Sequence, residues 1–137
     1  MSGIVYYSGY KYLLAETYAC QIGIKPERAV STNFVELGTD GWLKIHAGYA
    51  WDGPSGPTVD TRNFMRGSLV HDALYQLMRE RHIDRDKWKD TADKLLRQMC
   101  LEDGMSTVRA WWVYHGVSSF GRGSTLPENN RPLLTAP

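Results

Sequence analysis

The sequence predicts an α+β fold, in which an N-terminal antiparallel β-meander precedes a three-helix unit. Three observations support this prediction. Side chains alternate in the first half of the chain, glycine and proline interrupt residues 47–63, and apolar residues recur at helical spacing from about residue 64. We expect residues 1–121 to form a single α+β domain and residues 122–137 to form an extended C-terminal arm.

Two patterns indicate strands. Over residues 10–22, tyrosine, leucine, cysteine and isoleucine at even-numbered positions alternate mainly with smaller or polar residues. Farther along, residues 34–37 and 42–46 flank the sequence Gly-Thr-Asp-Gly at 38–41. Such a four-residue connection between two strand-like runs is typical of a β-hairpin. The Gly/Pro-broken segment that follows predicts a shaped loop.

Three helices are predicted after this loop. The first spans about residues 64–81, where apolar residues form one helical face. The second is capped by Asp84 and ends at Gly104, and the third is capped by Ser106 and runs to about Phe120.

Composition excludes several classes of protein. The net charge of +1 gives no electrostatic reason to expect nucleic acid as a partner. No apolar run approaches the roughly 20 residues of a transmembrane helix. The N-terminus has neither the basic region nor the apolar region of a signal peptide, so we expect synthesis in the cytoplasm without one. Cys20 and Cys100 are expected to be isolated thiols.

The candidate site lies on the first predicted helix. His71, Tyr75 and Met78 follow one another at i, i+4 and i+7 and share one side of the helix, beside the apolar stripe. We expect His71 and Tyr75 to be half buried there. Asp72 is rotated by about 100° from His71 and is predicted to face the preceding loop.

The second predicted helix offers a partner for His71. Asp90 lies near Lys94 and is expected to be solvated, whereas Asp93 lies nearer the flank that faces the first helix. With a turn near residues 82–84, antiparallel packing places His71 at about 15 Å and Asp93 at about 12 Å from the turn. A histidine held by a buried aspartate is the arrangement of a general base. The plainer alternative is a core histidine without a chemical role.

These residues resemble a known family. Domain-of-unknown-function family 1353, which occurs in tailed phages and bacteria, carries an Asp-x-x-Ser-x-Pro element, a His-Asp-x-x-Tyr helix and a later Asp. The chain resembles it over residues 44–121, at Asp52, Gly53, Pro54, Ser55, Pro57, Arg66, His71, Asp72, Tyr75 and Asp93. The resemblance implies a phage-associated protein that is made in the host cytoplasm.

The same run is similar to the site of bacterial and fungal secreted phospholipase A2. In those enzymes an Asp-Gly-Cys-Ser loop precedes a His-Asp-x-x-Tyr helix, and a second helix supplies an aspartate. This resemblance implies a phospholipase A2-like helix pair in which His71 is the general base, Asp93 orients it, and Tyr75 hydrogen-bonds within the network.

The phospholipase resemblance also implies a calcium site. The side chains of Asp72 and Asp52 and the carbonyl group of Gly53 would hold the ion, which would polarise the ester carbonyl group. The cysteine of the phospholipase loop is replaced here by Pro54.

Three functions remain open. The first is calcium-dependent hydrolysis of a phospholipid or another cell-envelope substrate. The second is a zinc-dependent peptidoglycan hydrolase, with His71 and Asp72 as ligands beside another histidine, for which His46 and His115 are candidates. The third is a non-catalytic, tail-associated virion component that keeps the fold and has other virion proteins as partners.

Overall fold

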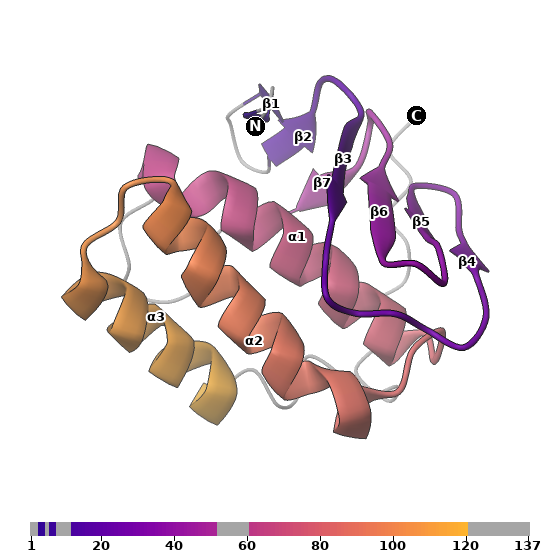
Figure 1. Ribbon diagram of the computed structural model, residues 1–137. Coiled ribbons are helices and arrows are strands. Elements are labelled where there is room, and N and C mark those ends of the chain that lie inside the picture. Colours follow the sequence, from indigo (N-terminus) through magenta and orange to yellow (C-terminus); the bar gives the residue numbers. More distant parts are fainter. Residues whose placement is uncertain (1–2, 5, 8–11, 52–60, 121–137) are drawn as a thin grey trace.

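Strands occupy the first half of the chain and helices the second, as predicted for an α+β fold. The computed structural model describes residues 3–4, 6–7, 12–51 and 61–120 (Figure 1). Their elements are β1 (Tyr6–Tyr7), β2 (Tyr12–Leu14), β3 (Tyr18–Gln21), β4 (Val30–Ser31), β5 (Val35–Leu37), β6 (Trp42–Ile45), β7 (Ala50–Trp51), α1 (Arg62–Arg79), α2 (Arg85–Glu102) and α3 (Thr107–Phe120). The arm predicted at residues 122–137 lies outside the described residues.

The strands form two antiparallel sheets. One sheet has the order β1-β2-β7, and the other has the order β3-β6-β5-β4. β4, β5 and β6 form the meander that was predicted, but β3 adds to the far side of β6 instead of pairing with β4. Within the described part of the alternating run, residues 12–22, β2 belongs to one sheet and β3 to the other. Leu14 at the end of β2 and Tyr18 at the start of β3 are nevertheless both buried. Both stand at even-numbered positions, as the alternating pattern predicts for the buried side.

The predicted hairpin is confirmed as β5 and β6, with Leu37 opposite Leu43. Its loop closes through a hydrogen bond from the amide of Gly38 to the carbonyl oxygen of Trp42, at 2.9 Å. Gly41 has a φ of 86°, and a Cβ atom there would lie 2.3 Å from the carbonyl oxygen of Ile22. Glycine is therefore required at this turn, where the loop meets the end of β3.

The helix termini follow the capping residues that the sequence predicts. The side chain of Asp84 accepts a hydrogen bond from the amide of Asp86 at 2.9 Å, and the hydroxyl of Ser106 accepts one from Arg109 at 3.2 Å. α1 ends earlier than residue 81. Arg81 has a φ of 64°, and the amide of the next residue bonds back to the carbonyl oxygen of Leu77, which closes the last turn.

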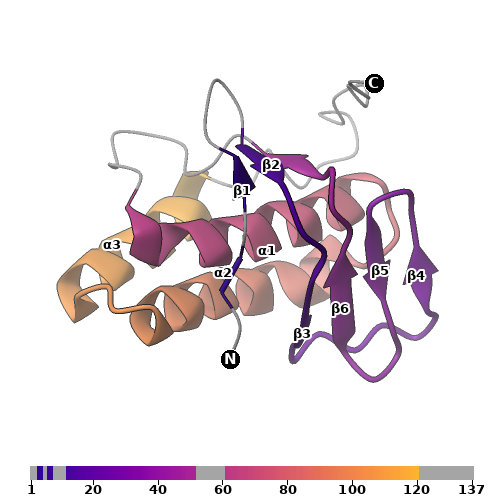
Figure 2. The same ribbon diagram turned by 90° about the horizontal axis from the view of Figure 1, so that it is seen from above.

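α1 is enclosed on two sides. Figures 1 and 2 show the strands on one side of α1 and α2 on the other, with α3 packed on α2. On the strand side, the indole N–H of Trp51 donates to the hydroxyl of Ser68 at 3.1 Å. On the other side, α2 approaches so closely that a Cβ atom on Gly67 would lie 2.9 Å from Leu96 Cδ1. Most side chains of α1 are consequently buried.

The predictions for the two cysteines and for membrane-spanning helices can be compared with the described residues. Both Cys20 and Cys100 carry free thiols. No helix in this part of the chain combines the length and the apolar character needed to cross a membrane.

Candidate active site

A buried polar cluster joins α1 to α2. Nε2 of His71 lies 2.8 Å from Oδ1 of Asp93, and the hydroxyl of Tyr75 donates to the same oxygen at 2.5 Å. Asp93 has no accessible surface, and His71 and Tyr75 are 6% and 4% exposed. The contact expected between His71 and Asp93 is therefore present.

The positions of His71 and Tyr75 follow from helix geometry. They lie one turn apart on α1, and their ring centroids are 4.0 Å apart. The expectation that they are half buried is wrong. Because strands cover one side of α1 and α2 covers the other, the flank of the apolar stripe is enclosed along with the stripe itself.

Lys89 is a member of the cluster that the sequence reasoning missed. It lies one turn before Asp93 on α2, and its Nζ is 2.8 Å from Asp93 Oδ2. The same Nζ lies 3.4 Å from the carbonyl oxygen of Val117 and 3.5 Å from that of Ser118, in the last turn of α3. The i, i+4 spacing of Lys89 and Asp93 was a visible signal, but that spacing is common among solvent-exposed pairs. The packing of α3 is what encloses the lysine.

The environment sets the charge of each group. Burial lowers the pKa of His71, although the carboxylate of Asp93 partly opposes this shift, so the imidazole is neutral at pH 7. Burial alone would raise the pKa of Asp93, but hydrogen bonds from His71, Lys89 and Tyr75 outweigh it and lower the pKa, so the carboxylate is ionised. Burial, reinforced by Asp93, raises the pKa of Tyr75, whose hydroxyl remains a donor.

Stability is expected to fall in mildly acidic solution because of His71. Its pKa in the folded chain lies below the ordinary value of 6.5, so the unfolded chain binds this proton at higher pH than the folded chain. The contribution of His71 to stability is thus complete above pH 6.5 and is lost as the pH falls. The expected slope is at most about 1.4 kcal/mol per pH unit. Urea unfolding at about pH 7.5, 6.5 and 5.5 measures this slope, because these pH values bracket the ordinary pKa of histidine.

A matched pair of variants assigns the slope to one residue. His71→Gln should flatten the pH dependence, because the group that titrates differently in the two states is gone. His115→Gln, at an exposed position on α3, should keep it. Equal slopes in the two variants would contradict the assignment.

The predicted metal ligands are only partly described. Asp52 and Gly53 lie outside the described residues, and Asp72 is partly exposed on α1 with an interaction of its own. Within the described ranges, no three His, Cys, Asp or Glu side chains gather to hold a metal ion. His46 pairs instead with Glu36, and His115 lies beside Trp111, with 3.9 Å between ring centroids. The calcium and zinc sites therefore stay predictions.

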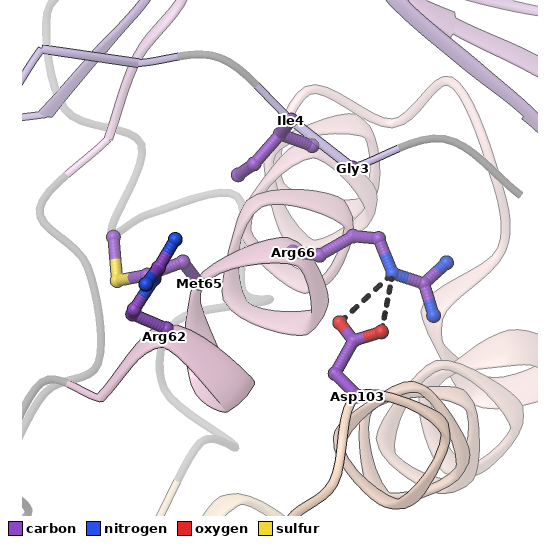
Figure 3. A pocket seen from close by; sticks show the side chains of 6 residues that line it. All are labelled: Gly3, Ile4, Arg62, Met65, Arg66 and Asp103. Atoms are coloured by element: carbon purple, nitrogen blue, oxygen red, sulfur yellow. Dashed lines mark hydrogen bonds and ion pairs between the residues drawn. The ribbon is translucent and has the colours of Figure 1, made fainter.

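Arg66 lies outside the cluster. Its Nε donates to both carboxylate oxygens of Asp103, at 2.9 and 3.2 Å, its Nη1 donates to the hydroxyl of Tyr18, and its Nη2 donates to Glu102. Figure 3 shows the guanidinium group turned toward Asp103 at the wall of a surface pocket of about 360 Å³. None of the residues that line this pocket belongs to the His71 cluster. Arg66 therefore ties α1 to β3 and to the end of α2.

Residues 30–117 match a family model whose description is "Protein of unknown function (DUF1353)". The match covers more than half of the chain. The chain belongs to the DUF1353 family. All four residues of the cluster, His71, Tyr75, Lys89 and Asp93, fall within the DUF1353 match, as does the β5–β6 hairpin. No curated protein and no solved structure matches the chain significantly.

Proposed function

We propose that this DUF1353 protein is a hydrolase in which His71 is the general base and Asp93 orients it. The contact between His71 Nε2 and the ionised carboxylate of Asp93 carries this proposal. An ionised carboxylate accepts and does not donate, so the ring proton lies on Nε2. The other ring nitrogen, Nδ1, keeps its lone pair and has no hydrogen-bond partner among the described residues.

The arrangement suits the hydrolysis of an ester. Nδ1 of His71 would take a proton from a water molecule as the water oxygen attacks the carbonyl carbon. The imidazolium ion that forms is stabilised by Asp93 through Nε2. The ring then returns the proton to the leaving alkoxide as the carbon–oxygen bond of the ester breaks, which restores the neutral imidazole.

The substrate class that we propose is a phospholipid of the cell envelope, cleaved as by phospholipase A2 in a phage-associated setting. The resemblance to the phospholipase A2 site supports this substrate class, and it is carried by His71, Asp72, Tyr75 and Asp93. Asp72 would hold calcium together with Asp52 and the Gly53 carbonyl group. When bound, calcium would supply polarisation of the ester carbonyl group.

Release of fatty acid from phospholipid vesicles in the presence of calcium tests the proposal. His71→Ala should lower the turnover number by about 100-fold or more, because a general base contributes a factor of that size. His115→Ala, an exposed histidine on α3, should retain full turnover, and EGTA should abolish turnover in the unaltered protein.

Two results would count against this function. One is an absence of lipid hydrolysis by the folded, calcium-loaded protein. The other is unchanged turnover in His71→Ala, which would place the catalytic group elsewhere.

A non-catalytic, tail-associated role is the second candidate, and α3 favours it. Val108, Trp111 and Trp112 are 67%, 42% and 65% exposed on this helix. Exposed aromatic and aliphatic side chains that lie together are typical of protein interfaces. Mass spectrometry of purified phage particles should detect the protein if this role is correct, and its absence from particles would exclude it.

A further inference from the structure

We propose that Lys89 is a positioning residue of this site, which fixes the carboxylate of Asp93 so that Oδ1 faces His71. The inference deepens the proposed function and rests on it for the role assigned to His71. It concerns the geometry of the cluster, which can be measured without a substrate.

The ammonium group of Lys89 is held from three directions. It has three N–H donors, and three oxygens lie within hydrogen-bond distance, namely Asp93 Oδ2 and the carbonyl oxygens of Val117 and Ser118. The two carbonyl groups belong to the last turn of α3, where backbone carbonyl groups lack partners within the helix. The side chain of Lys89 is only 15% exposed. Its position is therefore set by α3 as well as by α2.

The carboxylate of Asp93 depends on this contact. Oδ1 accepts from His71 and Tyr75, and Oδ2 accepts from Lys89. Donors on both oxygens fix the plane of the carboxylate. Among the described residues, Lys89 is the partner that brings a full positive charge to Asp93, whose own side chain has no accessible surface. Without it, Oδ2 would be a buried acceptor with no donor, which is unfavourable enough to make the carboxylate turn.

A turned carboxylate would weaken the bond to His71. Nε2–H would lose its acceptor or share it, and the imidazole would no longer be confined to one orientation and one tautomer. Lys89 would thus act on the base through Asp93, without touching the ring nitrogens itself.

The signal of the Nε2 proton of His71 tests the proposal. In a ¹⁵N-edited spectrum of the full chain, a proton in a buried bond to a carboxylate is shifted downfield and exchanges slowly with water. The His71→Gln variant identifies the signal. We expect this signal in the unaltered protein and in Lys89→Arg, which keeps the charge. In Lys89→Met we expect the signal to disappear, or its proton to exchange with water at least about tenfold faster. This is the response expected when a buried hydrogen bond opens.

The matched control is Lys94→Met. Lys94 lies on the same helix and pairs with Asp90 at the same i, i+4 spacing, 3.0 Å from its Oδ2, but at an exposed position. This variant should leave the Nε2 signal unchanged.

Two outcomes overturn the inference. One is an unaltered protein whose His71 carries its proton on Nδ1. The other is a folded Lys89→Met whose Nε2 signal and exchange rate are unchanged. If the methionine variant does not fold, Lys89→Gln, which also lacks the charge, is compared in the same way. Because no substrate is added, absence of lipid hydrolysis would refute the proposed function while leaving this result intact.

Discussion

Replacement of Asp93 by alanine is expected to lower the free energy of unfolding by about 3–5 kcal/mol, the usual effect of removing one partner of a buried ion pair. The carboxylate accepts three hydrogen bonds, from His71, Tyr75 and Lys89. Its removal leaves the ammonium group of Lys89 enclosed between α2 and α3 without a counter-charge. It also leaves the Tyr75 hydroxyl and the Nε2–H group of His71 without their acceptor.

Urea unfolding at pH 7, compared with Asp90→Ala, measures the effect. Asp90 lies one turn earlier on α2 and bonds to Lys94 and to the hydroxyl of Tyr114, but it is exposed. Exposed ion pairs contribute about 0–1 kcal/mol, so this variant should lose little. If both variants lost the same small amount, Asp93 would not be an ionised acceptor in a buried cluster.

Features that depend on near neighbours in the sequence could be predicted. The helices follow from apolar periodicity, and the caps at Asp84 and Ser106 follow from side chains that bond to an amide two or three residues away. The β5–β6 hairpin follows from its four-residue loop. In each case the decisive interaction lies within one element or one turn, so residue type and spacing are sufficient.

The arrangement of β3 could not be predicted in this way. A period-2 pattern shows which side chains share a face, but it does not identify the neighbouring strand. β3 pairs with β6 and not with β4, which follows it in the chain. In the sequence of residues 10–22, the larger side chains stay mainly at even-numbered positions on both sides of residues 15–17. The pattern therefore gives no sign that the chain changes sheets between Leu14 and Tyr18.

The part of the candidate site that depends only on the pairing of α1 with α2 could be predicted. The rise per residue places His71 and Asp93 at similar heights in an antiparallel pair, and their contact is present. The depth of burial and the role of Lys89 depend on two further layers, the strands over α1 and the last turn of α3 over α2. Sequence spacing within α1 and α2 contains no information about these layers.

The burial of the cluster has a cost in desolvation free energy. Four polar side chains lie at the interface of α1 and α2, beside the apolar core. Both oxygens of Asp93 accept hydrogen bonds from the other three side chains, which limits the desolvation penalty. Replacement by apolar residues of the same shape would often be neutral or stabilising. Stability alone therefore gives no reason for a buried polar cluster in this helix pair, which agrees with the chemical role that we propose for it.

The second large effect is expected at Arg66, where replacement by alanine should lower the free energy of unfolding by about 3 kcal/mol. Arg66 is 5% exposed, and its guanidinium group donates to Tyr18, Glu102 and Asp103, so it joins α1 to β3 and to the end of α2. This loss lies at the lower end of the range for removing one partner of a buried ion pair. The reason is that the side chains of Glu102 and Asp103 are 48% and 22% exposed and can be rehydrated.

Arg62→Ala is the matched control for this expectation, since Arg62 lies one turn earlier on α1 and is exposed (Figure 3). Thermal unfolding at pH 7 should show a large loss for Arg66→Ala and a change within about 0.5 kcal/mol for Arg62→Ala. Arg66→Lys should recover only part of the loss, because a lysine ammonium group lacks the planar fork of donors with which the guanidinium group bonds Asp103, Tyr18 and Glu102 at the same time. A full recovery by lysine would mean that charge alone, and not the planar fork of donors, holds β3 and α2 to α1.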